Sequence, residues 1–347
     1  MPKVSFTEAL ATRPWLLADG ATGTNYFQMG LVSGDAPEMW NFEHPERVRE
    51  LHRRFIEAGA DIVLTNSFGG NRHRLKLHNA QDKVHEVNVA AAKNARAEAD
   101  AAGRDVYVGG SIGPTGEIFM PVGMMPYEEG VAAFAEQAMA LKDGGVDVLW
   151  IETMSSEEEL RAAVEGAAQA GLPIVTTMSF DTNGRTMMGI TPKAFGAITA
   201  ALPHQPCAIG ANCGVGASEL VATVMGITEA RPDAAVALRA DVDRVRTDAG
   251  HDQFVRELHQ RVGGHRRDGG RRDREQLHHG MARRRPFGRR RLARIRGALG
   301  RREGVRHERV VGAGEGWSRS GCWMPAPSSR RRRARACAIS SAVRGRP

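Results

Sequence analysis

Polar residues follow several apolar runs of this sequence at positions where chemistry is often carried out. Asp19 comes before a glycine-rich turn, Glu152 follows the apolar run VLWI, and Asn66 and Cys213 follow two further runs. A carboxylate at the end of a buried strand requires a partner, because burying an unpaired charge is costly. Carboxylates suit an ammonium group, loop amides suit a carboxylate and sulfur suits a soft ligand. The set therefore predicts a pocket for a small zwitterion.

Each of these residues also has a simpler interpretation. Asp19 precedes Gly20 and is typical of a turn. A lone cysteine such as Cys213 is often an inert small hydrophobic residue. His73 and His78, which lie among basic residues, are interpreted as part of a solvated helix face and not as metal ligands.

The segments that would position these residues repeat one pattern. In 58–68, 144–153 and 170–180, a small residue and glycine precede a β-branched apolar run that ends in polar residues. Such unbroken apolar runs are typical of strands buried on both faces. Strands are predicted at 16–20, 61–68, 106–113, 146–153, 173–180, 207–214 and, more weakly, 235–240. Helices are predicted at 43–59, 127–145 and 155–171 from apolar spacing and capping residues.

Alternation of helices with buried strands predicts an α/β protein with right-handed crossovers. The repeat favours a (β/α)8 TIM barrel with its site at the carboxyl ends of the strands. An open doubly wound sheet is the alternative, because periodicity does not establish closure. Only six to seven units are recognisable, so the predicted barrel domain, residues 1–240, is incomplete.

Charge divides the chain into two unlike parts. Residues 1–235 hold 18 lysines and arginines against 29 acidic residues, whereas residues 236–347 hold 30 arginines, no lysine and 11 acidic residues. Residues 241–347 are predicted to be a disordered, low-complexity tail, since they have too little apolar content for a core. Without a signal peptide, a long apolar segment or a disulfide framework among four cysteines, a cytoplasmic protein without membrane contact is expected.

Five motifs in order resemble the homocysteine S-methyltransferases, and most closely the bacterial betaine–homocysteine branch. These motifs are LLADGATGTNYFQMGL (16–31), LTNSFGGNRHRL (64–75), GSIGPTGE (110–117), WIETMSS (150–156) and GANCGVG (210–216). The resemblance covers about residues 14–235. It implies a zinc-dependent TIM-barrel enzyme that passes a methyl group to the homocysteine thiol and forms methionine.

The resemblance also implies roles for individual residues. Cys213 corresponds to one of three cysteine ligands of Zn²⁺, and zinc would hold the homocysteine sulfur as a thiolate. Asp19 and Glu152 correspond to the residues that hold the ammonium group of homocysteine. Gly20, Ala21 and Thr22 correspond to the loop that receives its carboxylate, and Asn66 is a further predicted substrate-binding residue. No catalytic residue beyond the metal site is assigned.

The methyl donor is not determined by these motifs, and betaine is favoured. Aromatic faces would hold its quaternary ammonium by cation–π attraction. Four aromatic residues near early strand ends are candidates, although core packing explains each equally well: Tyr26, Phe27, Trp40 and Phe68.

The family's other two zinc ligands, an adjacent pair of cysteines in a GGCCG motif, are missing. Cys207 would lie about 20 Å from Cys213 at the other end of one strand. Cys322 and Cys337 stand alone among arginines. Activity is therefore doubtful, and a reading-frame shift near residues 235–240 of the gene is our hypothesis for the abrupt change in composition. The alternative function is an inactive barrel remnant whose basic tail contacts nucleic acid nonspecifically through phosphates.

Overall fold

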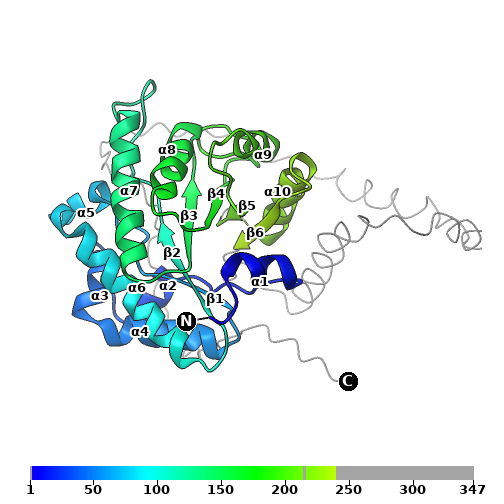
Figure 1. Ribbon diagram of the computed structural model, residues 1–347. Coiled ribbons are helices and arrows are strands. Elements are labelled where there is room, and N and C mark those ends of the chain that lie inside the picture. The colour runs from blue at the N-terminus through cyan, green and yellow to red at the C-terminus, as the bar shows by residue number, and fades with distance from the viewer. Residues whose placement is uncertain (1, 214–215, 240–347) are drawn as a thin grey trace, which may run out of the picture. The chain divides into compact units, whose positions relative to one another are not determined.

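Six parallel strands form the centre of the protein. The computed structural model describes residues 2–213 and 216–239. Each strand pairs with the next along the chain, in the order β1-β2-β3-β4-β5-β6 (Figure 1). The strands are β1 (Ile62–Leu64), β2 (Tyr107–Ile112), β3 (Val148–Met154), β4 (Ile174–Met178), β5 (Ala208–Asn212) and β6 (Ala235–Arg239).

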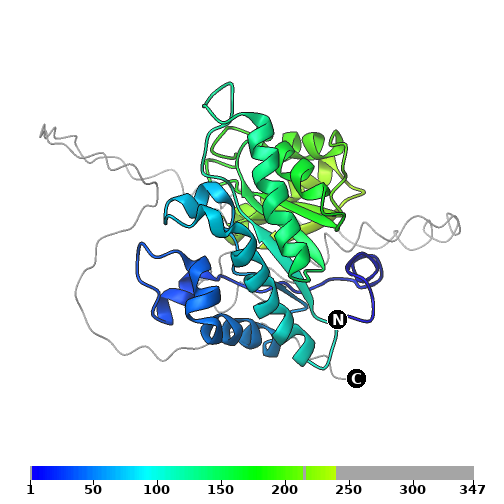
Figure 2. The same cartoon turned by 60° about the vertical axis from the view of Figure 1, so that its left-hand side comes forward.

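Helices connect successive strands and cover the outside of the sheet (Figures 1 and 2). Before β1 come α1 (Phe6–Thr12), α2 (Gly23–Gln28), the 3-10 turn η1 (Pro37–Met39), α3 (Trp40–Glu43) and α4 (Pro45–Glu57). Later come α5 (Arg72–Lys76), η2 (Gln81–Lys83), α6 (Val84–Ala101), α7 (Tyr127–Asp143), α8 (Glu157–Ala168), α9 (Pro192–Ala200) and α10 (Ala217–Ala230). None of them has the combination of length and apolarity needed to cross a membrane.

Local sequence signals explain where the predicted helices begin and end. Pro45 occupies the first turn of α4, and the Ser156 hydroxyl accepts a hydrogen bond from the Glu159 N–H at the start of α8. The glycines that follow α4 and α8, Gly59 and Gly171, have φ of 106° and 70°. This left-handed conformation is open to glycine and ends helices.

Alternation along the strands divides the core into two layers. Odd-numbered β2 residues and even-numbered β3 residues face inward, as shown by Tyr107, Val148 and Trp150 in the inner apolar cluster. Val108 and Leu149, next to them in sequence, pack in the outer cluster beneath the helices. Such a sheet is buried on both faces, which is why its strands read as continuous apolar runs.

Helix α1 closes the amino end of the inner layer. The Phe6 ring packs edge-on against the Tyr107 ring at 5.6 Å, and the Tyr107 hydroxyl donates a hydrogen bond to the Val4 carbonyl. The amino end of the sheet is therefore filled by apolar side chains, and the carboxyl end is left for polar ones.

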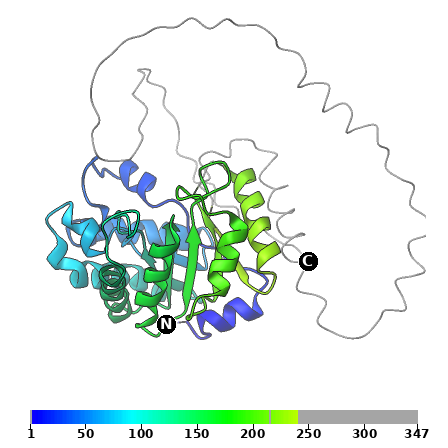
Figure 3. The ribbon, with the colours of Figure 1, turned by 90° about the horizontal axis from the view of Figure 1, so that it is seen from above.

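The sheet curls strongly, as seen from above in Figure 3. Arg239 at the end of β6 bonds the carbonyl of Gly20, which follows the segment beside β1. Six flat strands would span about 24 Å, which is far beyond the reach of one arginine side chain. The α/β fold and an incomplete TIM barrel are thus confirmed as predicted.

Two expectations differ from the structure or fall outside it. The strand predicted at 16–20 is reduced to one bridge, Ala18 to Ile62, because the chain turns away at Asp19 to begin the glycine-rich loop. The predicted boundary at residue 240 and the predicted disordered tail, residues 241–347, lie outside the described residues.

Candidate functional site

Strand alternation brings three polar side chains to the inner face at the carboxyl end of the sheet. Glu152 follows the inward Val148 and Trp150 by steps of two, and Arg239 follows the inward Ala237 in the same way. Asn212 ends β5 opposite Arg239 in the β5–β6 register. The same two-residue alternation therefore turns both the inner core residues and these polar side chains to the inner face.

Asp19 enters this site from the first, shortened strand segment. Its Oδ2 accepts a hydrogen bond of 2.8 Å from the Leu64 N–H, and its own N–H donates to the Ile62 carbonyl. Burial raises the pKa of Asp19 to about 6, although Arg239 and the Leu64 N–H act to lower it. A carboxylate this strongly desolvated gains much from a cation placed beside it.

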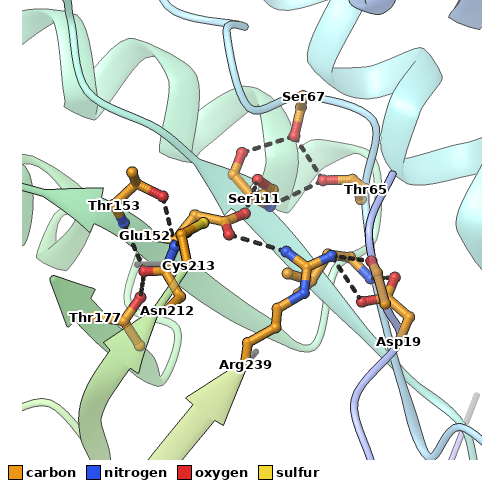
Figure 4. A network of polar contacts seen from close by, with 12 residues as sticks. Asp19, Thr65, Ser67, Ser111, Glu152, Thr153, Thr177, Asn212, Cys213 and Arg239 are labelled. Carbon is orange, nitrogen blue, oxygen red and sulfur yellow. Dashed lines mark hydrogen bonds and ion pairs between the residues drawn. The ribbon is translucent and has the colours of Figure 1, made fainter. Parts of the chain in front are cut away.

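Glu152 is held by a chain of hydroxyl groups from two neighbouring strand ends (Figure 4). The Ser111 hydroxyl donates a 2.6 Å hydrogen bond to Glu152 Oε1, and the Ser111 N–H donates to Thr65 Oγ1. Thr65 and Ser67 hydroxyls are bonded to each other at 2.6 Å, and Ser67 donates to the Ser111 carbonyl. These buried contacts fix one carboxylate oxygen and leave Oε2 facing the site.

Arg239 lies between the two carboxylates and was not among the predicted site residues. Its Nη1 is 3.0 Å from Glu152 Oε2, and its Nη2 is 3.3 Å from Asp19 Oδ1 and also donates to the Gly20 carbonyl. Burial acts to lower the pKa of Arg239, but Asp19 and Glu152 more than offset it, and the pKa is raised. The signal that would have found it is an arginine two residues after an inward alanine in the last strand.

A β-bulge at the end of β3 lies beside Glu152. The β3–β4 register shifts between Ile151 and Met154, and Thr153 has φ of 65°. This left-handed conformation is strained for a β-branched residue. The Thr153 N–H donates to Asn212 Oδ1 at 2.9 Å, and the Asn212 Nδ2 donates to Thr153 Oγ1 at 2.7 Å. Asn212 thus clamps the bulge from the neighbouring region of the sheet.

Cys213 follows Asn212 in the sequence and lies beside Glu152 (Figure 4). It is exposed, has φ of 58°, and its N–H donates to the Arg239 carbonyl at 3.0 Å. Its sulfur accepts a 3.1 Å hydrogen bond from Asn212 Nδ2. Desolvation raises the pKa of the thiol, although the Asn212 contact acts to lower it.

The part of the chain that the structure describes does not fit a zinc ion. No three His, Cys, Asp or Glu side chains gather there as a ligand set. Cys207, at the other end of β5, donates its thiol to the Ile174 carbonyl, and burial raises its pKa to about 11. Cys322 and Cys337 lie outside the described residues. Cys213 is thus placed at the site without the two sulfur partners that the motif resemblance implies.

Of the other predicted binding residues, Gly20 contacts the site and the Asn66 side chain points away from it. Gly20 contributes its carbonyl to the site, and Ala21 and Thr22 lead from it into α2. Asn66 is turned elsewhere, since its side-chain amide donates to the Pro37 carbonyl at 2.7 Å. Its predicted contact with substrate is not tested by this geometry.

The four candidate aromatic residues do not form a shared cage of free faces. Tyr26 and Trp40 are buried against each other with ring centroids 5.5 Å apart, and Arg47 already lies 5.0 Å above the Trp40 ring. Phe27 and Phe68 are exposed.

Solved structures share this fold at low sequence identity. The oxidized form of the homocysteine methyltransferase MmuM from Escherichia coli is 22% identical, with a TM-score of 0.61 over 74% of this chain and 90% of that one. Its metallated form is 21% identical, with a TM-score of 0.56 over 73% of this chain and 98% of that one.

Curated relatives are more similar in sequence but much longer. Methionine synthase of Mycobacterium leprae (strain TN) is 33% identical over 228 residues, which are 61% of this chain and 19% of the relative. Methionine synthase of Mycobacterium tuberculosis (strain ATCC 25618 / H37Rv) is 32% identical over 220 residues, which are 59% of this chain and 18% of the relative. The chain spans about a fifth of the length of these relatives.

A match to a family model covers more of the chain than the motifs did. The model described as homocysteine S-methyltransferase matches residues 16–271, which extends past residue 235, where the motif resemblance was expected to end. Since this match includes well over half of the sequence, the chain belongs to the homocysteine S-methyltransferase family.

Proposed function

We propose that the carboxyl end of this sheet is a homocysteine-binding site that holds the ammonium group of the amino acid between Asp19 and Glu152. The observation that carries the proposal is their convergence: Asp19 Oδ1 and Glu152 Oε2 both lie within 3.3 Å of one buried cation, the Arg239 guanidinium. Two desolvated carboxylates aimed at one point form a cation-binding subsite. Homocysteine provides such a cation and a thiol, the group that accepts the methyl in this family.

The reaction at such a site is a displacement at the methyl carbon. The homocysteine thiol loses its proton to solvent, and its sulfur forms the new bond to that carbon as the bond to the donor's leaving group breaks, which gives methionine and the demethylated donor. Asp19 and Glu152 hold the amino acid in one orientation, and the buried hydroxyl chain behind Glu152 keeps that carboxylate in place. Fixing the nucleophile in this way is worth a large part of a barrier to bimolecular reaction.

Zinc is the expected cofactor of the family, and Cys213 is its candidate ligand in this chain. When bound, zinc would keep the substrate sulfur as a thiolate at neutral pH. A structural-strength site requires about four ligands, and among the described residues no three His, Cys, Asp or Glu side chains gather as a ligand set. We therefore expect the purified chain to contain much less than one equivalent of zinc, as measured by elemental analysis. Stoichiometric zinc that is lost in Cys213→Ala would contradict this expectation.

Betaine remains the predicted donor, on the resemblance alone. The buried Tyr26–Trp40 pair gives it no support, because Arg47 already covers one face of Trp40. A methionine-formation assay that offers betaine, S-methylmethionine and methyl-folate separately would identify the donor of an active chain.

Calorimetry with matched ligands tests the acceptor proposal. L-homocysteine should bind at least about 10-fold more tightly than 4-mercaptobutyrate, which lacks only the amino group, because a hydrogen bond to a charged group is worth about 1.5–3 kcal/mol. Asp181→Asn, an exposed substitution, is the control and should leave this preference unchanged. Equal affinity for the two ligands, both in the parent chain and in Arg239→Ala, where the two carboxylates are free, would contradict the proposal.

The alternative function, an inactive remnant with a nucleic-acid-binding tail, depends on residues that the structure does not describe. It stays a prediction, as does the frame shift near residues 235–240. Resequencing of the coding DNA tests the frame shift, since a single-base change should restore a GGCCG-like motif if that hypothesis is right. A salt-sensitive, sequence-independent gel shift of the intact chain would favour the alternative function.

A further inference from the structure

Arg239 takes up every acceptor that the proposed ammonium subsite offers among the described residues. Nη1 bonds Glu152 Oε2 at 3.0 Å, whereas Nη2 is 3.3 Å from Asp19 Oδ1 and donates to the Gly20 carbonyl. Three acceptors, two from the adjacent residues Asp19 and Gly20 and one from the end of β3, match the three donors of an ammonium group. A guanidinium and an ammonium cannot share them.

Burial makes the competition severe. The side chains of Asp19, Glu152 and Arg239 are 2%, 6% and 16% exposed. Two carboxylates in such surroundings require a positive charge nearby, but one arginine already supplies the charge that a bound amino acid would bring. A second buried cation would also repel the first.

The fit of Arg239 is incomplete, which makes its displacement feasible. Its Nε is buried and, within residues 2–213 and 216–239, has no hydrogen-bond partner. Asp19 Oδ1 likewise has only the 3.3 Å ion pair and no hydrogen bond there. An ammonium group centred between the acceptors would leave no such buried donor unsatisfied.

From these contacts we infer that Arg239 is a built-in occupant of the amino-group subsite, which the substrate must expel before it can bind. The inference rests on the proposed homocysteine site and deepens it. In this arrangement only the fraction of molecules with Arg239 withdrawn binds the amino acid, so the apparent affinity is reduced by that fraction. Residue 239 therefore decides whether an amino acid is accepted.

Removal of the guanidinium tests the inference directly. Arg239→Ala should bind L-homocysteine at least about 10-fold more tightly than the parent chain in calorimetry, since the competing cation is gone. Arg239→Lys, which keeps a cation at the same position, should recover much less of this gain. Arg185→Ala, in which an exposed arginine is removed, is the matched control and should bind as the parent does.

Methylguanidine separates failure of this inference from failure of the proposed function. It should bind Arg239→Ala, compete there with homocysteine and bind the parent at least about 10-fold less tightly. If Arg239→Ala gains methylguanidine binding but not homocysteine binding, the vacated cation subsite stands and the homocysteine proposal fails. If the folded variant gains neither ligand, or the parent binds homocysteine as tightly as the variant does, the inference is overturned.

A measurement on the unaltered chain covers the case in which the variant does not fold. Phenylglyoxal modification of Arg239, followed by peptide mass spectrometry, should accelerate when L-homocysteine is added, because the expelled guanidinium becomes accessible. An unchanged or slower rate would overturn the inference. Arg185 serves as the internal reference for reagent reactivity, as an exposed arginine.

Discussion

The carboxylate side and the thiol side of the site are built to very different degrees. On the carboxylate side, Asp19 and Glu152 are buried, and each is bonded by the backbone or a hydroxyl of a neighbouring strand end. On the thiol side, Cys213 is exposed and its sulfur is contacted by the adjacent Asn212. The two sides lie in one network but do not depend on the same parts of the chain.

This contrast follows from how each ligand is bound. An ammonium group needs two or three oxygen acceptors, which Asp19, Gly20 and the end of β3 supply. A metal-bound sulfur needs several thiolates at one point, and the described residues bring one. The first kind of subsite is therefore present among the described residues, whereas the second is not.

The largest expected effect is on the carboxylate side. Glu152→Ala removes the acceptor for Ser111 Oγ and Arg239 Nη1 and leaves a buried guanidinium with one carboxylate fewer. Breaking a buried ion pair in this way costs about 3–5 kcal/mol in the free energy of unfolding. Urea denaturation measures it. Glu158→Ala, on the exposed face of α8, is the control, with a change within about 0.5 kcal/mol.

A small effect of Glu152→Ala, similar to that of its control, would break the comparison. It would mean that Arg239 already leaves the site in most molecules, and that the carboxylate side is as loosely held as the thiol side.

The pH dependence of the free energy of unfolding tests the raised pKa of Asp19. Its pKa is raised to about 6 in the folded protein against 3.8 unfolded, so the folded state binds the extra proton between these values. The resulting stabilisation is fully present below pH 3.8 and is lost as pH rises through 6. It amounts to about 3 kcal/mol.

Subtraction of the Asp19→Asn variant from the parent, in urea denaturation from pH 4 to 7, measures this contribution. The subtraction is needed because burial lowers the pKa of His52 in α4 to about 4. That histidine stabilises above pH 6.5 and loses the effect as pH falls, with the opposite sign. A parent-minus-variant difference that does not change with pH would contradict the raised pKa of Asp19.

The sequence predicted the carboxylate side better than the thiol side for physical reasons. Asp19 and Glu152 come at the ends of apolar runs, and strand alternation alone places Glu152 inward. Arg239 was missed because its partners lie 87 and 220 residues away in the chain. Alternation along β6 places Arg239 inward, but its contacts with Asp19 and Glu152 exist only after the sheet has curled.

Two further structural details could not be predicted from the sequence, because they too depend on contacts between distant segments. The positive φ of Thr153 depends on a bulge in the β3–β4 pairing and on Asn212 from β5. The strand predicted at 16–20 shortened to one bridge because its glycine-rich continuation turns toward the site. The positions of β1 to β6 and the starts of α4 and α8 depend on short-range signals, and these were predicted correctly.

Asn212 connects the two sides, and its removal should have an intermediate effect. Asn212→Ala leaves the Thr153 N–H and the Thr177 hydroxyl without their shared acceptor and frees the strained bulge. We expect a loss of about 1–3 kcal/mol in the free energy of unfolding. Thr177→Val, which removes one of these contacts only, should cost clearly less. Equal losses in the two variants would show that Asn212 does not hold the bulge.

The smallest effect is expected on the thiol side, and its sign is the informative part. Cys213 has φ of 58°, a conformation that is costly for residues with a Cβ and free for glycine. Because its side chain is exposed, Cys213→Gly should raise the free energy of unfolding, by less than about 1 kcal/mol.

The same substitution at Cys207 should act in the opposite direction. Cys207 has no positive φ and packs against the inner apolar cluster, so Cys207→Gly should lower stability by about 1 kcal/mol or more through lost packing and a more flexible unfolded chain. Destabilisation by Cys213→Gly comparable to that of Cys207→Gly would mean that contacts of the Cys213 sulfur, including the one from Asn212, outweigh the relief of its positive φ. The thiol side would then also be held by its contacts, and the contrast with the carboxylate side would disappear.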